Sequence, residues 1–169
     1  MSDLAYLARP GADAVSADLS ARAAGIARRV AAVVQEHCTP ESGALDTVAF
    51  LQGWSESVES GAFDPARLAS PLQRIERVFG LTEDEIDLLL LAGMTEEHEG
   101  LAATFRSLHP TGEPRPTAGL GALLLGGGPR DRSRVRELLS SGRAVEHGLL
   151  RLEGTVPFFE RSLVLADEL

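Results

Sequence analysis

The sequence contains no lysine and no asparagine, and all 16 of its basic residues are arginine. In nucleoside triphosphatases a lysine follows the glycine-rich turn of the phosphate-binding loop, and in covalent catalysis a lysine amine forms the Schiff base. The chain as written therefore supports neither activity. The absence of asparagine excludes N-linked glycosylation, because that modification requires an asparagine acceptor.

Cysteine and long apolar runs are also scarce. Cys38 is the only cysteine, so no disulfide can form within the chain, as is typical of proteins in a reducing compartment. Residues 1–19 lack the basic start and the apolar core of a signal peptide. The densest apolar run, residues 86–94, is too short to span a bilayer. We therefore expect a soluble, cytoplasmic protein that does not enter a membrane.

The chain has fewer basic than acidic residues. The chain has 25 acidic residues against 16 basic ones, which gives a formal net charge of −9. This balance opposes a general electrostatic attraction to nucleic acids or anionic membranes, because binding to phosphates depends on basic side chains. With 169 residues, of which 44% are hydrophobic, the chain is long enough to bury a core without disulfides or metal.

Two amphipathic helices are predicted near the N-terminus. Apolar residues recur every three or four positions over residues 16–37, and Ser16 is placed to cap this helix. A second helix is predicted over residues 44–60, with Gly61 ending it. Residues 1–15 show no clear period, so we expect them to form a loose arm.

The clearest local signal is the start of a helix in the middle of the chain. Thr82 and Glu85 have the spacing of a capping box, and Leu81 and Ile86 fit the accompanying hydrophobic staple. The helix that begins here is apolar on nearly all sides, so we expect it to be the central buried helix. Gly93 is predicted to end it.

Further helices are predicted on both sides of the central one. A segment that opens at Asp64-Pro65 restarts at Ser70-Pro71 and ends at Gly80. Thr95 is placed to cap a helix that ends near His109. A short helix over residues 117–125 follows a proline-rich loop.

The last part of the chain changes from helical to strand-like patterning. A helix over residues 130–141 is followed by two short strands, 149–152 and 159–165, joined through residues 154–157. Helices followed by a hairpin have the layout of a winged helix, a relative of the helix-turn-helix. The helix over 130–141 is then the recognition helix, and residues 153–160 form the tip of the wing.

The predicted fold class is therefore mainly α, with an N-terminal helical pair followed by a winged-helix domain. Residues 1–64 form the arm and the helical subdomain, and residues 65–169 form the winged-helix domain with its C-terminal two-stranded β-ribbon.

Arginines gather on the predicted recognition helix and beyond it. Six arginines lie between residues 129 and 151 against three acidic residues. A helical wheel places Arg134 and Arg136 on opposite flanks of the apolar face and Glu137 outward. The candidate partner-binding residues are these arginines and two aromatic residues near the wing tip: Arg130, Arg132, Arg134, Arg136, Arg143, Phe158 and Phe159. A protein-facing basic surface, a DNA-binding helix and a solvated helix all remain open.

No pattern in the sequence predicts catalysis, a metal site or a cofactor site. His37 and Cys38 are adjacent on a helix, so their side chains point about 100° apart. The stretch 96–99 contains one histidine, whereas a metalloprotease helix needs two histidines four residues apart. Seven acidic residues and no arginine lie between residues 83 and 99. These acids stabilise helix N-termini or form a docking face for a basic partner.

The chain resembles the winged-helix region that precedes the ATPase core in a bacterial group of AAA+ ATPases. Four phrases carry the resemblance in the family's order: LQRIERVFGLTEDEIDLLLLA at 72–92, RPTAGLGALL at 115–124, VEHGLLRL at 145–152 and FERSLVLAD at 159–167. The resemblance covers residues 65–169. Such ATPases occur, among other settings, with phage-tail-like contractile injection systems.

The resemblance implies a non-catalytic, N-terminal interaction domain of an ATP-binding protein. Such a domain recruits protein partners or substrate, or packs against an AAA+ core that lies beyond residue 169. ATP and magnesium would bind only to that core, and oligomers would form through it. The alternative from a different class is a DNA-binding regulator that uses helix 130–141 and the wing. That alternative predicts duplex binding that weakens steeply with salt.

Overall fold

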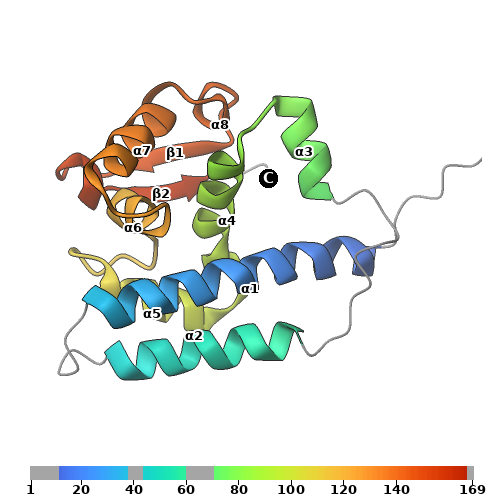
Figure 1. The fold of residues 1–169 in the computed structure, drawn as a ribbon, viewed down its shortest axis with the longest axis vertical. Coiled ribbons are helices and arrows are strands. Elements are labelled where there is room, and N and C mark those ends of the chain that lie inside the picture. The colour runs from blue at the N-terminus through green and yellow to red at the C-terminus, as the bar shows by residue number, and fades with distance from the viewer. Residues whose placement is uncertain (1–11, 38–43, 60–70, 167–169) are drawn as a thin grey trace, which may run out of the picture.

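The computed structural model describes residues 12–37, 44–59 and 71–166. It confirms the predicted fold class, because the described chain is mostly helical and ends in a two-stranded antiparallel sheet (Figure 1). The helices are α1 (Ala12–His37), α2 (Ala44–Glu59), α3 (Pro71–Phe79), α4 (Glu83–Glu97), α5 (Glu99–Leu108), α6 (Ala118–Leu124), α7 (Pro129–Ser141) and α8 (Arg143–Glu146). The strands are β1 (Leu150–Glu153) and β2 (Ser162–Leu165).

Helices α1 and α2 run antiparallel along one side of the molecule (Figure 1). The predicted apolar stripe of α1 is buried, with Ile26 and Val30 among its least exposed residues. Helix α1 begins at Ala12, four residues before the predicted start at Ser16. The loose arm predicted for residues 12–15 is therefore wrong. Alanine is the strongest helix former, and residues 12–15 contain two alanines and neither glycine nor proline.

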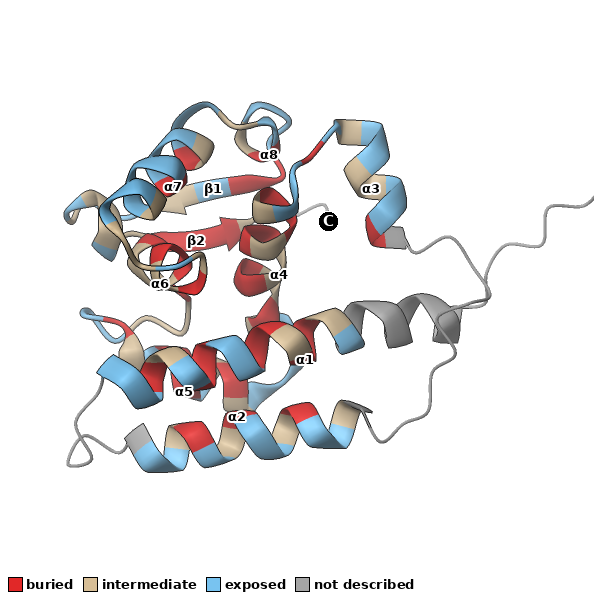
Figure 2. Ribbon diagram, in the orientation of Figure 1, coloured by how far each residue is buried: buried red, intermediate tan, exposed pale blue. Residues whose placement is uncertain are grey.

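Helix α4 is the central helix, as predicted. Its buried residues point to several sides, and Figure 2 shows buried positions along α4 and on the adjoining side of α1. The predicted capping box is present: the Glu85 backbone N–H donates to Thr82 Oγ1 at 3.3 Å, and the Thr82 N–H donates to Glu85 Oε2 at 2.9 Å. Buried residues of α1, α2 and α4–α8 and of both strands contribute to one hydrophobic core. The division of the chain at residue 64 stays a prediction.

Glu85 also joins α4 to a second helix. Its side chain is only 2% exposed, and Oε1 accepts a hydrogen bond from the Ala144 backbone N–H of α8 at 3.0 Å. Burial alone raises the pKa of this carboxyl group. Hydrogen bonds from Thr82, Ala144 and Arg143 outweigh burial and leave the Glu85 pKa below its ordinary value.

The boundary between α4 and α5 differs from the prediction. Helix α4 continues through Gly93 to Glu97, and His98 rather than Thr95 caps α5, with His98 Nδ1 accepting from the Gly100 N–H at 2.9 Å. Gly93 does not end the helix; it lies where α4 packs against Leu165 of β2. A Cβ atom there would lie 3.0 Å from Leu165 Cδ1, so the glycine lets β2 approach α4 closely.

The sheet is shorter than predicted at its second strand. Strands β1 and β2 pair from Leu150 opposite Leu165 to Glu153 opposite Ser162, and residues 158–160 form a 3-10 turn instead of strand. We call this the wing turn. Thr117 pairs with Ser162 as an isolated bridge, so the segment before α6 extends the sheet by one position.

Helix α8 is a further difference, because Gly142 both ends α7 and begins this four-residue helix. The predicted helix start at Asp64-Pro65 and the predicted end at Gly61 lie outside the described residues. Within the described ranges, no helix has the length and hydropathy needed to cross a membrane.

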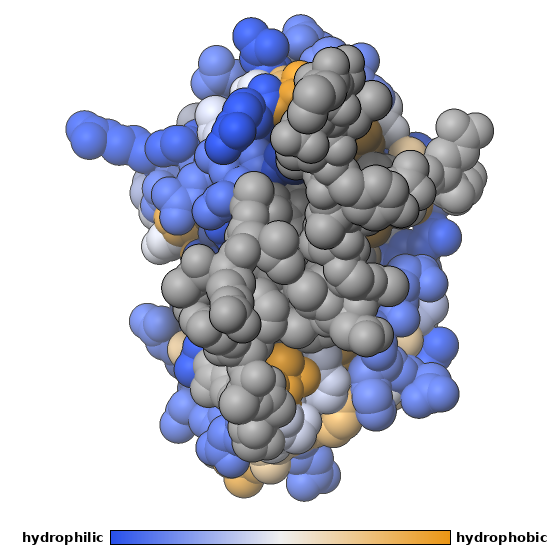
Figure 3. Space-filling view, turned by 90° about the vertical axis from the view of Figure 1, so that its right-hand side faces the viewer, coloured by the Kyte–Doolittle hydropathy of each residue, from blue (hydrophilic) through white to orange (hydrophobic). Residues whose placement is uncertain are grey.

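The described surface is largely hydrophilic on the side at the right of Figure 1. Figure 3 shows mostly hydrophilic side chains around the undescribed atoms on the side at the right of Figure 1. Among the described residues, the exposed large hydrophobics are Leu45 of α2 and Val78 of α3. These two helices lie on opposite sides of α1 in Figure 1, so the two side chains do not form a common patch.

Candidate functional site

Four of the predicted partner-binding residues meet in one surface cluster between α7 and the wing turn. The rings of Phe158 and Phe159 pack edge to face, with centroids 5.2 Å apart. The guanidinium carbon of Arg132 lies 4.1 Å from the Phe159 centroid, and that of Arg136 lies 4.9 Å from the Phe158 centroid. We call these four residues the arginine–phenylalanine cluster.

Local geometry explains how the cluster forms. Arg132 and Arg136 are four residues apart on a helix, so they project from the same flank of α7. The wing turn is held against α6 by close backbone approach: a Cβ atom at Gly119 would lie 2.8 Å from the Phe159 carbonyl oxygen. Arg161 Nε donates to the Val156 carbonyl oxygen at 3.0 Å and braces the loop that leads into the turn.

The other predicted arginines lie elsewhere. Arg134 projects from the opposite flank of α7 and forms an ion pair with Asp84 in the first turn of α4. Arg143 begins α8, and its side chain lies beside Gly80, between α3 and α4. Arg130 is exposed in the first turn of α7. The wheel prediction that Arg134 and Arg136 occupy opposite flanks is confirmed.

The outward face of α7 carries one cation and one acid. Arg130, Ser133, Glu137 and Ser140 are exposed there, between the two arginine-bearing flanks. Among the arginines of α7, Arg132 and Arg136 are the two that stack on the wing turn. A guanidinium that stacks on a ring still has N–H groups at its edge, and these can donate two parallel hydrogen bonds to a carboxylate. The arginine–phenylalanine cluster is therefore suited to binding carboxylate groups.

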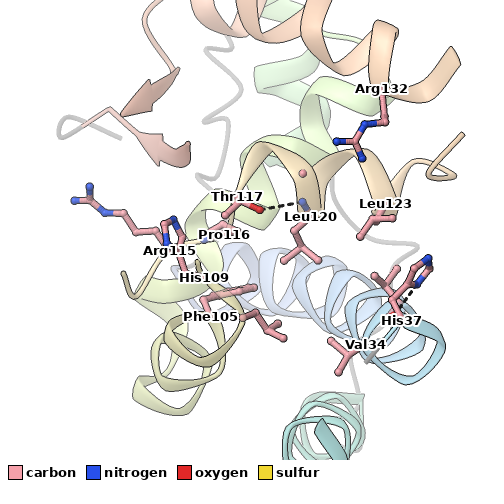
Figure 4. Close-up of a pocket in the computed structure, with 13 residues that line it drawn as sticks. Val34, His37, Phe105, His109, Arg115, Pro116, Thr117, Leu120, Leu123 and Arg132 are labelled. Atoms are coloured by element: carbon pink, nitrogen blue, oxygen red, sulfur yellow. Dashed lines mark hydrogen bonds between the residues drawn. The ribbon is translucent and has the colours of Figure 1, made fainter. Parts of the chain in front are cut away.

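A cavity of about 260 Å³ lies beside this cluster, and the sequence did not predict it. It opens between the end of α1, α5, α6 and the side chain of Arg132 (Figure 4). Its lining consists of Val33, Val34, His37, Phe105, Leu108, His109, Arg115, Pro116, Thr117, Gly119, Leu120, Leu123 and Arg132. The stretch 115–120 supplies five of these residues and belongs to the second phrase of the family resemblance. That phrase supported the family resemblance, but it did not mark this stretch as part of a cavity.

A polar network that includes two buried residues, His109 and Ser162, borders the cavity. His109 is 7% exposed, and its Nε2 lies 3.0 Å from Ser162 Oγ, which in turn donates to Glu113 Oε2 at 2.5 Å. The hydrogen bond from Ser162 holds the Glu113 pKa below its ordinary value. His109 Nδ1 accepts from the Thr111 N–H at 3.2 Å.

Serine, histidine and an acidic residue also form the catalytic triad of serine hydrolases, but their order of contacts differs here. In a catalytic triad the acid orients the histidine and the serine reaches the substrate. Here the acid contacts Ser162, which is 1% exposed within β2. The network therefore ties the loop before α6 to the sheet.

The described ranges contain no group of three or more histidine, cysteine, aspartate or glutamate residues placed to hold a metal ion. The expectations that this chain has no cofactor site and no catalytic activity stay predictions.

The sequence matches the family model described as "Winged helix domain, variant" over residues 4–167. This match includes α1 and α2 as well as the later helices and the ribbon. No curated protein matches the chain, and no solved structure matches it.

Proposed function

Because the chain belongs to the variant winged helix domain family, we propose that it is a protein-interaction domain that presents the arginine–phenylalanine cluster to acidic segments of a partner protein. Winged helix domains in general serve DNA binding or interaction with proteins. Our proposal selects the second role and assigns no catalysis to this chain.

The contacts made by the arginines of α7 are the observation that supports this proposal. A recognition helix that reads DNA offers its exposed side chains to base edges, and neighbouring cations contact the phosphates. In this chain Arg132 and Arg136 stack on the wing turn, and Arg134 pairs with Asp84. Arg130 is the one arginine of α7 on the outward face, Glu137 is exposed on the same face, and the net charge of −9 would repel a phosphate backbone.

A first experiment measures binding of a fluorescein-labelled, glutamate-rich peptide to the full chain by fluorescence anisotropy. We expect the double variant R132Q/R136Q to weaken this binding about tenfold or more, because it removes two charge-assisted contacts. The double variant R74Q/R106Q is the matched control, because it removes the same number of positive charges from exposed arginines of α3 and α5 outside the cluster. Equal loss in R74Q/R106Q would show that only net charge matters and would contradict the proposal.

A second experiment tests the DNA-binding alternative. A labelled DNA duplex replaces the peptide, and the salt concentration is varied. We expect weak binding even at low salt. Micromolar affinity that falls steeply with salt and is lost in R130Q would favour a DNA-binding regulator, because phosphate contacts release counterions.

We further propose that this domain precedes the ATPase core of a bacterial AAA+ protein. The four ordered phrases between residues 72 and 167 support this relationship. In that parent protein, which we place in the cytoplasm and among contractile injection systems, the core would bind ATP and magnesium and form any oligomer. Sequencing the native gene past codon 169 tests the proposal. A Gly-x-x-x-x-Gly-Lys-Ser/Thr motif and an apolar strand ending in Asp-Glu are expected, and their absence would overturn it.

A further inference from the structure

We infer that the cavity between α1, α5 and α6 receives an apolar side chain of a partner protein, and that Arg132 binds a carboxylate next to that side chain. This inference rests on the proposed function, because it specifies what an acidic partner segment must contain. The occupant is a short segment of the partner protein in which an aromatic or aliphatic residue adjoins a carboxylate. That carboxylate belongs to an aspartate, to a glutamate or to the partner's own C-terminus.

The size and walls of the cavity suit a single side chain. Its volume of about 260 Å³ lies just below the range of about 300–1,000 Å³ that is typical of small-molecule pockets. Apolar side chains from three helices form the walls: Val33, Val34, Phe105, Leu108, Leu120 and Leu123. Several of these are only half-buried, so an inserted side chain would remove additional apolar surface from water.

The charge around the cavity has one sign. None of the lining residues is acidic, although acidic residues outnumber basic ones by 25 to 16 in the whole chain. The titratable residues of the lining are His37, His109, Arg115 and Arg132. A ligand that combines an apolar body with a negative charge is therefore complementary to this site.

Arg132 is the lining cation that is available to a ligand. Arg115 forms an ion pair with Glu153 at 2.6 Å and points away from the cavity in Figure 4, whereas Arg132 extends toward it from α7. Within the described part of the chain, no carboxylate forms an ion pair with Arg132. The Phe159 ring under its guanidinium restricts its motion, so less conformational entropy is lost when it binds a carboxylate.

The test uses 3-phenylpropionate as the probe, because it joins a benzyl group to a carboxylate. Two-dimensional ¹H–¹⁵N NMR of the full chain reports which amides shift as the probe is added. We expect saturable shifts at Val34, Phe105 and Leu120, with binding about fivefold tighter than for the uncharged 3-phenylpropionamide. Equal affinity of the two probes would overturn the role of the carboxylate. Absence of shifts at the cavity would overturn the site.

Matched variants separate the two parts of the inference. R132Q should abolish the preference for the carboxylate while the amide still binds. R106Q is the control, because Arg106 is an exposed arginine of α5 that belongs neither to the arginine–phenylalanine cluster nor to the lining of the cavity, and it should keep the preference. L123F should fill the cavity and weaken binding of both probes. An unchanged preference in R132Q, or unchanged binding in L123F, would contradict the inference.

Two further outcomes are distinguishable. If the glutamate-rich peptide fails to bind while 3-phenylpropionate binds as expected, the proposed function fails and the cavity stands as a site for apolar carboxylates. If the cavity amides shift with protein concentration in the absence of any probe, a second copy of the chain is the occupant. That result would overturn the assignment to a partner segment.

Discussion

On the flank of α7 that faces the wing, two arginines lie over aromatic rings and keep their N–H edges in solvent. On the flank that faces α4, Arg134 is paired with Asp84, and nearby Glu85 holds the start of α8. Both flanks carry arginine, yet one leaves its guanidinium edges exposed over aromatic rings and the other joins helices of the fold. A cluster of arginines in sequence therefore does not form a single surface, because helical periodicity divides it.

The largest effect is expected on the flank toward α4. The substitution E85A should lower the free energy of unfolding by about 3 kcal/mol, because several backbone and side-chain donors lose a buried, charged acceptor. Urea denaturation followed by circular dichroism measures the change. E83A is the control, because Glu83 is exposed in the same helical turn and should change stability by less than about 0.5 kcal/mol. Similar effects of the two variants would contradict the linking role of Glu85.

A smaller loss of stability is expected on the flank toward the wing. F159A should lower the free energy of unfolding by about 1–2 kcal/mol, because Phe159 is half-buried and carries the guanidinium of Arg132. The same variant should weaken binding of the glutamate-rich peptide. F159L retains apolar volume but lacks the ring, so it should restore most of the stability and little of the binding. Full recovery of binding in F159L would show that stacking has no role.

Lowering the pH should destabilise the protein, because two carboxyl groups become protonated. The Glu85 and Glu113 pKa values are lowered in the folded state, so these groups stabilise the fold above their unfolded value of 4.5. That contribution is lost as the pH falls from 4.5 through the lower folded values. The urea midpoint should therefore decrease over this range. S162A removes the main hydrogen bond to Glu113 and should make the decrease shallower; an unchanged pH profile would contradict this account.

The smallest effect is expected from the exposed ion pair. R134Q should change stability by no more than about 0.5 kcal/mol, because the Arg134 side chain is 59% exposed and solvent screens the charges. It should also leave binding of the glutamate-rich peptide unchanged, in contrast to R132Q. Anisotropy titration of both variants provides the comparison. Equal weakening of peptide binding would show that the two flanks act as one surface.

The sequence predicted the helical elements well where short-range rules decide the structure. The capping box at Thr82 and the wheel positions of Arg134 and Arg136 depend on spacings of three or four residues, and both are confirmed. The predicted end of α4 at Gly93 was wrong for a long-range reason. That glycine makes room for Leu165 of β2, and no local pattern records such a contact.

The candidate site was predicted only in part. The sequence selected Arg132, Arg136, Phe158 and Phe159 among the partner-binding residues, but it did not show that these four meet while Arg130, Arg134 and Arg143 lie apart. It also did not indicate the cavity, because His37 and Arg132 are nearly a hundred residues apart. Their proximity depends on how α1 packs against α6.

By itself, the sequence determined the mainly helical fold class with its C-terminal ribbon, the position of the central helix and the absence of a lysine-dependent phosphate loop. These follow from composition, from hydrophobic periodicity and from capping, which act within a few residues of the chain. Only the tertiary structure decided which arginines stack on the wing turn and where an apolar cavity opens. Both depend on contacts between helices and strands that are distant in sequence, and those contacts form only when the elements pack around a common core.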